Sequence, residues 1–432
     1  MKKALFIISL LFLCFTAEAA EGFKLVGGAT AMGWPGDPAA DNAGYVLTDN
    51  GDGLFVYEGM LYPANGNDGH DGEFKFMVKE NGVFGGWETK QLHPMEQNST
   101  VGTETAVMAA GFDGSDDRKW TVVTTGWYRI TVAESSESFT VTAEFIDSPF
   151  RIVGGAYKGW STGPENTLAL SYSADETSAL YSAEGVLTHT DNADVDNSAF
   201  KLLTDTWEWM PCVCANEPYA AFGAFAPFEG QAVLRTSESE PDNKWLIANT
   251  GLYEVKLKID DNAAYTLSAQ YVPSLTVISG DNKVVCSRNV DDNSVVFSAE
   301  FDATNDGYAL LLGHADDSGN GWYLIADNSA PVAAFSENGD TPTHKAVYCN
   351  IDQARLQAAE DSYTLSADLS DWNAPSVRVE GNGTTTGLND IAADNEVPAE
   401  FYTLTGVKVE APLAPGIYIV RRTTTTKKMV IR

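Results

Sequence analysis

Apolar and polar residues alternate along several short stretches of the chain. In Tyr128-Arg129-Ile130-Thr131-Val132 and again in residues 253–259, every second side chain is apolar, which is the pattern of a β-strand with one buried face. A short acidic segment, 134–137, separates the first of these strands from an alternating strand at 139–143, and the pair predicts an antiparallel hairpin. Helical periodicity is nearly absent apart from a short turn expected within 352–359. The pattern predicts an all-β protein of tandem immunoglobulin-like β-sandwich domains with a small C-terminal β module.

The same series of motifs occurs twice in one order. Phe23-Lys24-Leu25-Val26-Gly27-Gly28-Ala29 returns as Phe150-Arg151-Ile152-Val153-Gly154-Gly155-Ala156. Three further pairs follow it in both copies: Gly33-Trp34 and Gly159-Trp160, Phe74-Lys75 and Phe200-Lys201, and Lys119-Trp120 and Lys244-Trp245. Such self-similarity predicts two homologous domains, which we place at 20–148 and 149–273.

The rest of the chain is more divergent. Residues 274–380 predict a third β-sandwich copy, which has no Gly-Trp near its opening strand. Gly, Thr, Asn and Asp predominate in 381–398, which is typical of a linker. The last segment, 399–432, predicts a small separate β module, and from Glu400 onward it carries six basic residues against two acidic ones.

The first 19 residues have the pattern of a signal peptide. Lys2 and Lys3 precede an apolar stretch that is too short to span a bilayer, and Ala17-Glu18-Ala19 supplies the small residues of a cleavage site. We therefore expect an exported protein. The 432 residues contain 60 Asp and Glu against 27 Lys and Arg, a net charge of -33. That charge repels phosphate backbones and anionic lipids, so we expect no nucleic-acid partner.

Exposed tryptophans are the candidate ligand-binding residues. A Trp ring stacks on the apolar face of a sugar, while amides, carboxylates and cations hydrogen-bond its hydroxyls. The tryptophans expected in loops are Trp34 and Trp87 in the first copy and Trp160, Trp207 and Trp209 in the second; the alternative is that they only pack against the core. Trp120 and Trp245 enter strands, which favours core packing.

Two lysines complete the candidate site. Lys75 and Lys201 alternate with apolar residues, so both point away from the core. Either they lie on an ordinary solvated strand face, or they hydrogen-bond sugar hydroxyls.

We expect no cofactor and no catalytic residues. Calcium is the alternative, because four loops are rich in carboxylate and amide oxygens: 49–52, 65–73, 113–117 and 191–196. Zinc-protease and phosphate-loop motifs are absent. Gly159-Trp160-Ser161-Thr162-Gly163 has the Gly-x-Ser-x-Gly spacing, but a nucleophile elbow leads from a strand into a helix, and helical periodicity is nearly absent. The 60 acidic residues leave a glycosidase-like pair of carboxylates open.

The cysteines leave one pairing open. In an exported protein Cys286 and Cys349 invite a disulfide. Cys212 and Cys214 are spaced awkwardly for a bridge, and no His lies close by in the sequence to complete a zinc site.

Two resemblances refine these expectations. The tail, Phe401-Tyr402-Thr403-Leu404-Thr405-Gly406 followed by Gly416-Ile417-Tyr418-Ile419-Val420 and a basic end, resembles the C-terminal sorting domain of the type IX secretion system of Bacteroidota. That resemblance implies the outer-membrane secretion machinery as a partner. It also implies a location at the cell surface, in the outer membrane or outside the cell.

The two clear copies resemble the SusE/SusF-type starch-binding outer-surface proteins. The resemblance is carried by the Gly-Gly and Gly-Trp motifs, by Gly53-Leu54-Phe55-Val56-Tyr57-Glu58-Gly59 and by the Phe-Lys pairs. It implies tandem β-sandwich modules that bind α-glucan through aromatic platforms and nearby Lys or Arg. Members of that family are normally lipoproteins, whereas this chain has a cleavable signal and a sorting tail.

The combined prediction is a non-catalytic exported protein that binds polysaccharide or oligosaccharide, with starch-like α-glucan the expected ligand. The alternative is a structural or adhesive surface protein with no sugar ligand. A glycoside hydrolase accessory that retains activity is a third reading.

Overall fold

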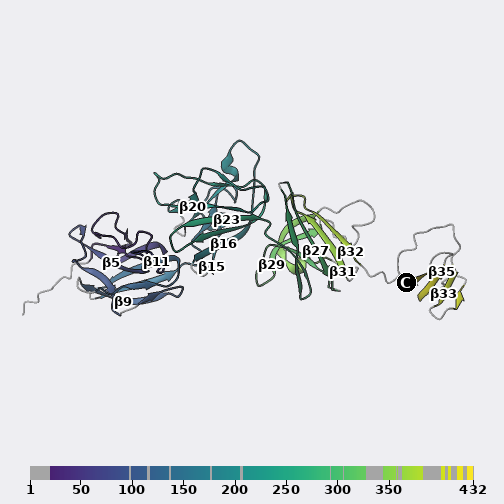
Figure 1. Ribbon diagram of the computed structural model, residues 1–432, viewed down its shortest axis with the longest axis horizontal. Helices are drawn as coiled ribbons and strands as arrows, with labels where there is room; N and C mark the ends of the chain where they lie inside the picture. Colours follow the sequence, from purple (N-terminus) through teal and green to yellow (C-terminus); the bar gives the residue numbers. More distant parts are fainter. Residues whose placement is uncertain are drawn as a thin grey trace, which may run out of the picture. The chain divides into compact units, whose positions relative to one another are not determined.

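The computed structural model describes residues 20–432 apart from fifteen short gaps. These gaps are 97–98, 114–116, 136–137, 176–177, 205–207, 292, 305, 327–343, 357, 359–361, 383–399, 404–406, 410–415, 422–425 and 432. The predicted signal peptide and nearly all of the predicted linker therefore lie outside the described residues. Almost all regular structure in the described part is β-strand, mostly in antiparallel sheets (Figure 1), which confirms the all-β prediction. The chain divides into two compact units between Pro273 and Ser274.

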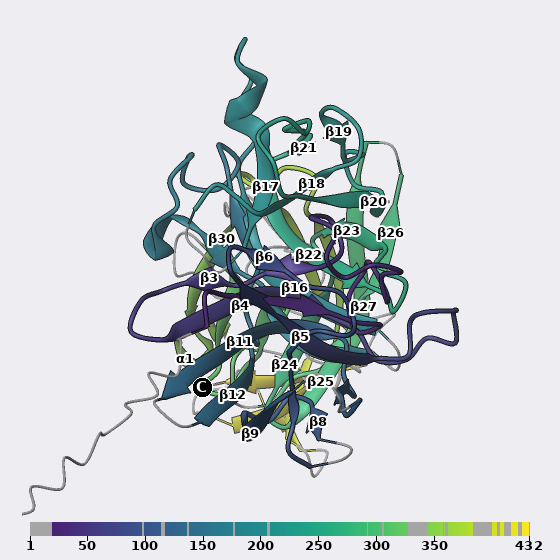
Figure 2. The same cartoon turned by 90° about the vertical axis from the view of Figure 1, so that its left-hand side faces the viewer.

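The first repeat is one sheet that surrounds a single core. Its main path runs in the order β2-β1-β5-β7-β9-β12-β11-β4-β3, and β4, β11 and β12 lie side by side (Figure 2). The predicted hairpin is β11 with β12, paired from Tyr128 opposite Phe145 to Ser135 opposite Ser138. The strands are β1 (Phe23–Val26), β2 (Tyr45–Val46), β3 (Thr48–Asp49), β4 (Leu54–Leu61), β5 (Glu73–Glu80), β6 (Val83–Phe84), β7 (Gln91–Pro94), β8 (Thr100–Val101), β9 (Ala106–Asp113), β10 (Trp120–Val122), β11 (Gly126–Ser135) and β12 (Ser138–Phe145).

The second repeat has the same strand order. Its path β14-β13-β17-β18-β20-β23-β22-β16-β15 corresponds strand by strand to that of the first repeat, so the duplicated sequence folds into a duplicated topology. The strands are β13 (Arg151–Val153), β14 (Leu168–Ala169), β15 (Ser171–Asp175), β16 (Ser178–Leu187), β17 (Ala199–Leu203), β18 (Cys212–Ala215), β19 (Ala220–Ala221), β20 (Phe228–Arg235), β21 (Trp245–Leu246), β22 (Gly251–Ile259) and β23 (Tyr265–Tyr271), with two short 3₁₀ turns, Pro164–Asn166 and Val195–Ser198.

The duplicated Gly-Gly motif has a steric reason. Gly27 and Gly154 have φ angles of +145° and +150°, a conformation that other residues rarely adopt. A Cβ on either glycine would lie 2.2 Å from a carbonyl oxygen of the neighbouring segment, that of Glu73 or Ala199. The motif therefore lets the chain leave the opening strand in close contact with the start of β5 or β17.

The two repeats of the first unit pack directly against each other. The Trp127 backbone N–H donates to the Tyr181 hydroxyl at 3.1 Å, and the Trp127 ring lies edge-on to Phe150 with centroids 5.4 Å apart. The Asn65 side chain donates to the carbonyl oxygen of Asp261 at 2.7 Å. These contacts bury aromatic side chains of both repeats.

The second unit begins with two packed sheets, in the orders β25-β24-β28-β29-β30 and β26-β27-β31-β32. Tyr308 joins them, since its ring contacts both Phe301 and Tyr363 of the four-stranded sheet. The elements are β24 (Leu275–Ser279), β25 (Asn282–Val285), β26 (Ser287–Val290), β27 (Val295–Asp302), β28 (Ala309–Leu312), β29 (Asn320–Ala326), β30 (His344–Asn350), α1 (Ile351–Ala354), β31 (Ser362–Asp368) and β32 (Ser376–Gly381).

The disulfide suggested for Cys286 and Cys349 is not formed, because both are free thiols. Cys286 follows β25 and Cys349 lies on β30, at the opposite edge of the five-stranded sheet. Four strand spacings separate these edges by about 19 Å, whereas a disulfide needs Cα atoms within about 7 Å.

The C-terminal residues form a separate four-stranded sheet in the order β34-β33-β35-β36. Its strands are β33 (Glu400–Thr403), β34 (Lys408–Val409), β35 (Gly416–Arg421) and β36 (Thr426–Ile431). In the described part of the chain no helix is long and apolar enough to cross a membrane.

Candidate functional site

The two candidate lysines occupy the same place in the two repeats. Lys75 on β5 lies opposite Val26 of the opening strand, and Lys201 on β17 lies opposite Val153. The aromatic residues before them, Phe74 and Phe200, are buried in the core, so both lysines project from the other face of the sheet. The strand pairing therefore places one lysine on the same face of the sheet in each repeat.

Of the two alternatives for these lysines, the ordinary solvated strand face is wrong, and the contact with sugar hydroxyls stays a prediction. Lys75 is only 4% exposed and Lys201 only 3%. Each ammonium lies 5.2 Å from the centre of a tryptophan ring, Trp87 for Lys75 and Trp209 for Lys201. Sequence alternation correctly shows that the lysines leave the core, but it does not show that a loop folds back and covers them.

Each buried ammonium has a carboxylate partner, which offsets the cost of removing a charge from water. Lys75 Nζ lies 3.1 Å from Asp117 Oδ1, and Lys201 Nζ lies 2.7 Å from Asp242 Oδ1. Both aspartates are at least two-fifths exposed. The ion pair therefore connects the base of the site to its surface.

In the first repeat a second tryptophan completes the site. Trp34 and Trp87 have ring centroids 5.8 Å apart and ring planes inclined by 58°. The Trp34 indole N–H donates to Asp71 at 2.8 Å, and the Trp87 indole N–H donates to the Gly36 carbonyl oxygen at 3.3 Å. Both rings are thereby held in place and remain partly exposed.

The second repeat has the same arrangement. Trp160 and Trp209 have centroids 6.3 Å apart at 42°, and Trp209 is 43% exposed. The Trp160 indole N–H donates to the backbone carbonyl oxygen of Asp196 at 3.2 Å. A cavity of about 560 Å³ lies between these rings and the charged groups, within the usual size range of ligand pockets.

A second lysine in each repeat was missed as a site residue. Lys119 lies 5.7 Å from the Trp34 ring centre, and Lys244 lies 5.4 Å from that of Trp160. Each follows the site aspartate by two residues, in Asp117-Arg118-Lys119-Trp120 and Asp242-Asn243-Lys244-Trp245. That shared Asp-x-Lys-Trp pattern is the signal that could have found both groups. The second repeat adds Arg235, which lies 3.4 Å from Asp242.

The lysines keep the site carboxylates ionised. The hydrogen bond from Lys119 is the main reason why the pKa of Asp117 lies below its ordinary value. Partial burial works to raise the pKa of Asp242, but the hydrogen bond from Lys201 and the charges of Lys201, Lys244 and Arg235 outweigh it and lower that pKa.

The other tryptophan predictions have different outcomes. Trp120 and Trp245 are fully buried, as expected of core residues. Trp207 lies outside the described residues, so its role stays a prediction. Of the acidic loops considered for calcium, two contribute Asp117 and Asp196, which contact Lys119 and Lys244 respectively; calcium binding itself stays a prediction.

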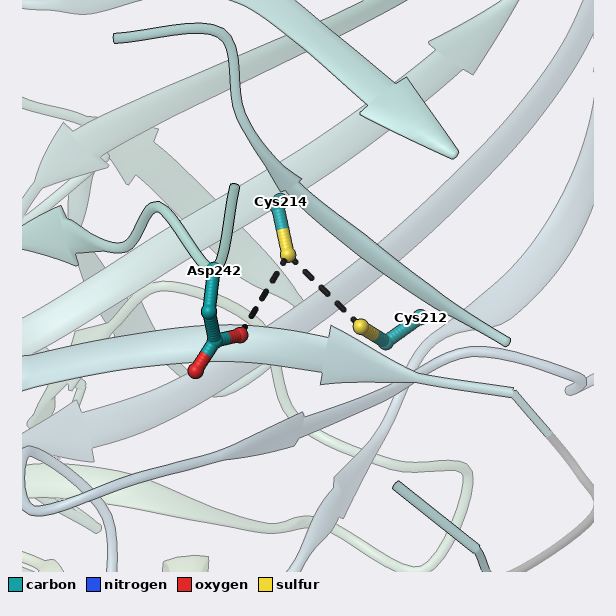
Figure 3. A group of neighbouring side chains, drawn as sticks. All are labelled: Cys212, Cys214 and Asp242. Atoms are coloured by element: carbon teal, nitrogen blue, oxygen red, sulfur yellow. Dashed lines mark hydrogen bonds between the residues drawn. The ribbon is translucent and has the colours of Figure 1, made fainter. Parts of the chain in front are cut away.

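A pair of cysteines lies beside the site of the second repeat (Figure 3). The sulfur atoms of Cys212 and Cys214 are 3.6 Å apart, and Cys214 Sγ lies 4.0 Å from Asp242 Oδ1. Their ligand atoms are close enough for one metal ion to reach all three. However, Lys201 and Arg235 already contact the same carboxylate and would repel a cation.

The geometry suits a neutral, hydroxyl-rich ligand. Two inclined indole rings offer apolar faces for a sugar ring, and the lysines and carboxylates beside them supply donors and acceptors for its hydroxyls. The same set of groups occurs in both repeats of the first unit.

Comparisons with known proteins add little to this description. No family model matches the chain, and no curated protein matches it. A solved structure to which the chain is similar is that of SusF from Bacteroides thetaiotaomicron, at 10% sequence identity and a TM-score of 0.19, covering 87% of this chain and 78% of that chain. So low a TM-score adds nothing to what the strands and side chains show.

Proposed function

We propose that this protein is an exported, non-catalytic glycan-binding protein that holds starch-like α-glucan at the two lysine–tryptophan sites of its first unit. The observation that carries the proposal is the duplication of the site itself. Trp87 and Trp209 come from loops of unlike sequence, yet each covers the lysine of its own repeat at 5.2 Å.

A purely structural role explains the tryptophans less well. Trp120 and Trp245 are the core tryptophans of the two repeats and are fully buried. Trp34, Trp87, Trp160 and Trp209 instead keep part of their rings in contact with solvent, although an exposed indole gains little hydrophobic stabilisation. Their exposure beside hydrogen-bonding groups favours ligand contact over the structural or adhesive alternative.

The charges of the site argue against glycoside hydrolysis there. A glycosidase needs one carboxylic acid that stays protonated at the working pH. In both repeats the cations lower the pKa of the site aspartate, so Asp117 and Asp242 are ionised and cannot act as general acids. Binding without catalysis is the function that this chemistry supports.

Two sites in one unit also fit a polymeric ligand. A repeating glucan offers many equivalent positions, and two linked weak sites gain affinity through effective concentration. The signal peptide and the sorting-like tail support a location at the cell surface or outside the cell, with the outer-membrane secretion machinery as the partner of the tail.

Affinity electrophoresis tests the proposal. The protein should be retarded in gels that contain amylopectin, more than in gels that contain dextran or xylan. The double variant Trp34→Ala/Trp160→Ala should lose the retardation, because truncating a stacked ring costs about 1–3 kcal/mol at each site. Trp372→Ala, in the second unit, is the matched control and should migrate like the unchanged protein.

Two results would contradict the proposal. A folded protein that no polysaccharide retards would favour the structural or adhesive alternative. Retardation that survives the double variant would place the binding site elsewhere. Release of sugar from amylopectin would instead show an enzyme.

A further inference from the structure

The second-repeat site has a third exposed ring at its rim, that of Tyr219. The residue is 41% exposed and comes directly before β19. Its hydroxyl donates to Asp196 Oδ1 at 3.2 Å, and Lys244 Nζ lies 5.8 Å from its ring centre. Asp196 and Lys244 line the cavity of about 560 Å³, whereas Tyr219 does not. The ring therefore lies directly outside the cavity, in contact with two of its lining residues.

Lys244 connects Tyr219 to the tryptophan pair. Its ammonium lies 5.4 Å from the ring centre of Trp160 and 5.8 Å from that of Tyr219. At the other end of the site, Trp209 contacts Trp160 and lies beside the ammonium of Lys201. The contacts thus run in the order Trp209, Trp160, Lys244 and Tyr219. A glucan chain that stacks on the two tryptophans reaches Tyr219 only with a further sugar ring, past Lys244.

The backbone at Tyr219 has a conformation that is unfavourable for tyrosine. Its φ angle is +46°, in the left-handed region that bulky residues rarely adopt. An exposed ring recovers little of that cost through burial. The hydrogen bond to Asp196, which is the main reason why the pKa of Tyr219 is raised, holds the ring in place instead. Such strain is typical of residues that are positioned for a function.

The first repeat has no aromatic residue at the corresponding sequence position. β8 and β19 are equivalent, because each pairs in parallel with the strand of the core tryptophan. In that register Ala221 corresponds to Thr100, so Tyr219, two residues earlier, corresponds to Asn98. Asn98 lies outside the described residues, but the sequence directly before β8, residues 95–99, contains no aromatic residue. The third ring is therefore a property of the second-repeat site.

We propose that Tyr219 provides an additional stacking position, so that the second-repeat site binds a longer stretch of glucan than the first-repeat site. The proposal rests on the proposed function, because it takes α-glucan as the ligand. It gives the two sites different preferences for chain length: short oligosaccharides fill both sites, and only longer ones reach Tyr219.

Titration calorimetry on the full chain, with one site removed at a time, tests this. Trp34→Ala leaves the second-repeat site, and Trp160→Ala leaves the first-repeat site. Each protein is titrated with maltotriose and with maltoheptaose, and the ratio of the two affinities measures the preference for the longer chain. That ratio should be at least threefold larger for Trp34→Ala, because a further stacked ring adds to the affinity of the longer chain alone.

Variants of Tyr219 in the Trp34→Ala protein identify the ring as the cause. Tyr219→Asn installs the residue of the first repeat, which also tolerates a positive φ, and should lower the ratio to that of Trp160→Ala. Tyr219→Phe keeps the ring and should keep most of the ratio. In the Trp160→Ala protein, which is the matched control, Tyr219→Asn should change neither affinity.

Equal ratios for the two single-site proteins, or an unchanged ratio after Tyr219→Asn, would overturn this proposal while the two glucan sites themselves stand. Failure of both single-site proteins to bind either oligosaccharide would overturn the proposed function and this extension together. The two failures are therefore distinguishable.

Discussion

Strand β17 of the second repeat places Lys201 opposite Val153 of the opening strand, whereas strand β28 of the divergent third repeat places Ala309 opposite Ile278. The flanking residues correspond, since Phe200 and Tyr308 are both buried aromatics. The strand orders β14-β13-β17-β18-β20 and β25-β24-β28-β29-β30 match, so the corresponding position carries a lysine in the second repeat and an alanine in the predicted third repeat.

The surroundings of the two positions differ accordingly. In the second repeat the lysine meets a carboxylate and a loop tryptophan. In the third repeat the same face carries an apolar cluster in which Ala309 packs with Ile278, Leu311, Tyr323 and Ala354 of the short helix α1. The helix occupies the face on which the other repeats hold their site. The comparison teaches that these strands can form without a lysine at this position. The lysine occurs only in the two repeats whose site tryptophan and aspartate contact it.

Moving the lysine into the third repeat should have the largest effect. Ala309→Lys would bury an ammonium among apolar side chains, and a pKa depressed by about three units corresponds to about 4 kcal/mol lost from the free energy of unfolding of the second unit. Urea denaturation measures this loss. Val285→Lys, at a position that is 70% exposed, is the control, and equal stability of the two variants would contradict the comparison.

Replacing the site lysine with the alanine of the third repeat should weaken glucan binding. Lys201→Ala, like Lys75→Ala, should weaken binding of a maltooligosaccharide about tenfold at its own site, the value of one charged hydrogen bond. Stability should change little, because Asp242 keeps Arg235 and Asp117 keeps Lys119 as partners.

Calorimetric titration with maltoheptaose measures the loss of affinity. Lys256→Ala, which removes an ion pair with Glu254 away from the site, should bind like the unchanged protein. Unaltered affinity after both site substitutions would leave the buried lysines without the proposed role.

The smallest effect is expected from pH. The folded-state pKa values of Asp117 and Asp242 are depressed, so their ion pairs are complete above the ordinary aspartate value of about 3.9. They are lost only as the pH falls through the depressed values. Glucan affinity should therefore change less than about twofold between pH 5 and 8, and a bell-shaped profile in that range would point instead to an acid–base group.

The sequence predicted one part of the candidate site better than the rest. Trp34 and Trp160 follow from the duplicated Gly-Trp motif, and Lys75 and Lys201 follow from the duplicated Phe-Lys motif. Trp87 and Trp209 were also predicted, from their loop-like surroundings. The sequence did not show that these two tryptophans occupy equivalent places, because the loops that carry them differ in length and sequence.

What the sequence determined by itself is the strand pattern, the duplication and the face of the sheet on which each lysine emerges. These features depend on neighbours one or two residues away, because successive side chains of a strand alternate between faces. Only the tertiary structure decided that the lysines are buried, that Asp117 and Asp242 pair with them, and that α1 replaces the site in the third repeat. Those outcomes depend on contacts between segments about 40 residues apart, and no local pattern of residues encodes which loop will cover which face.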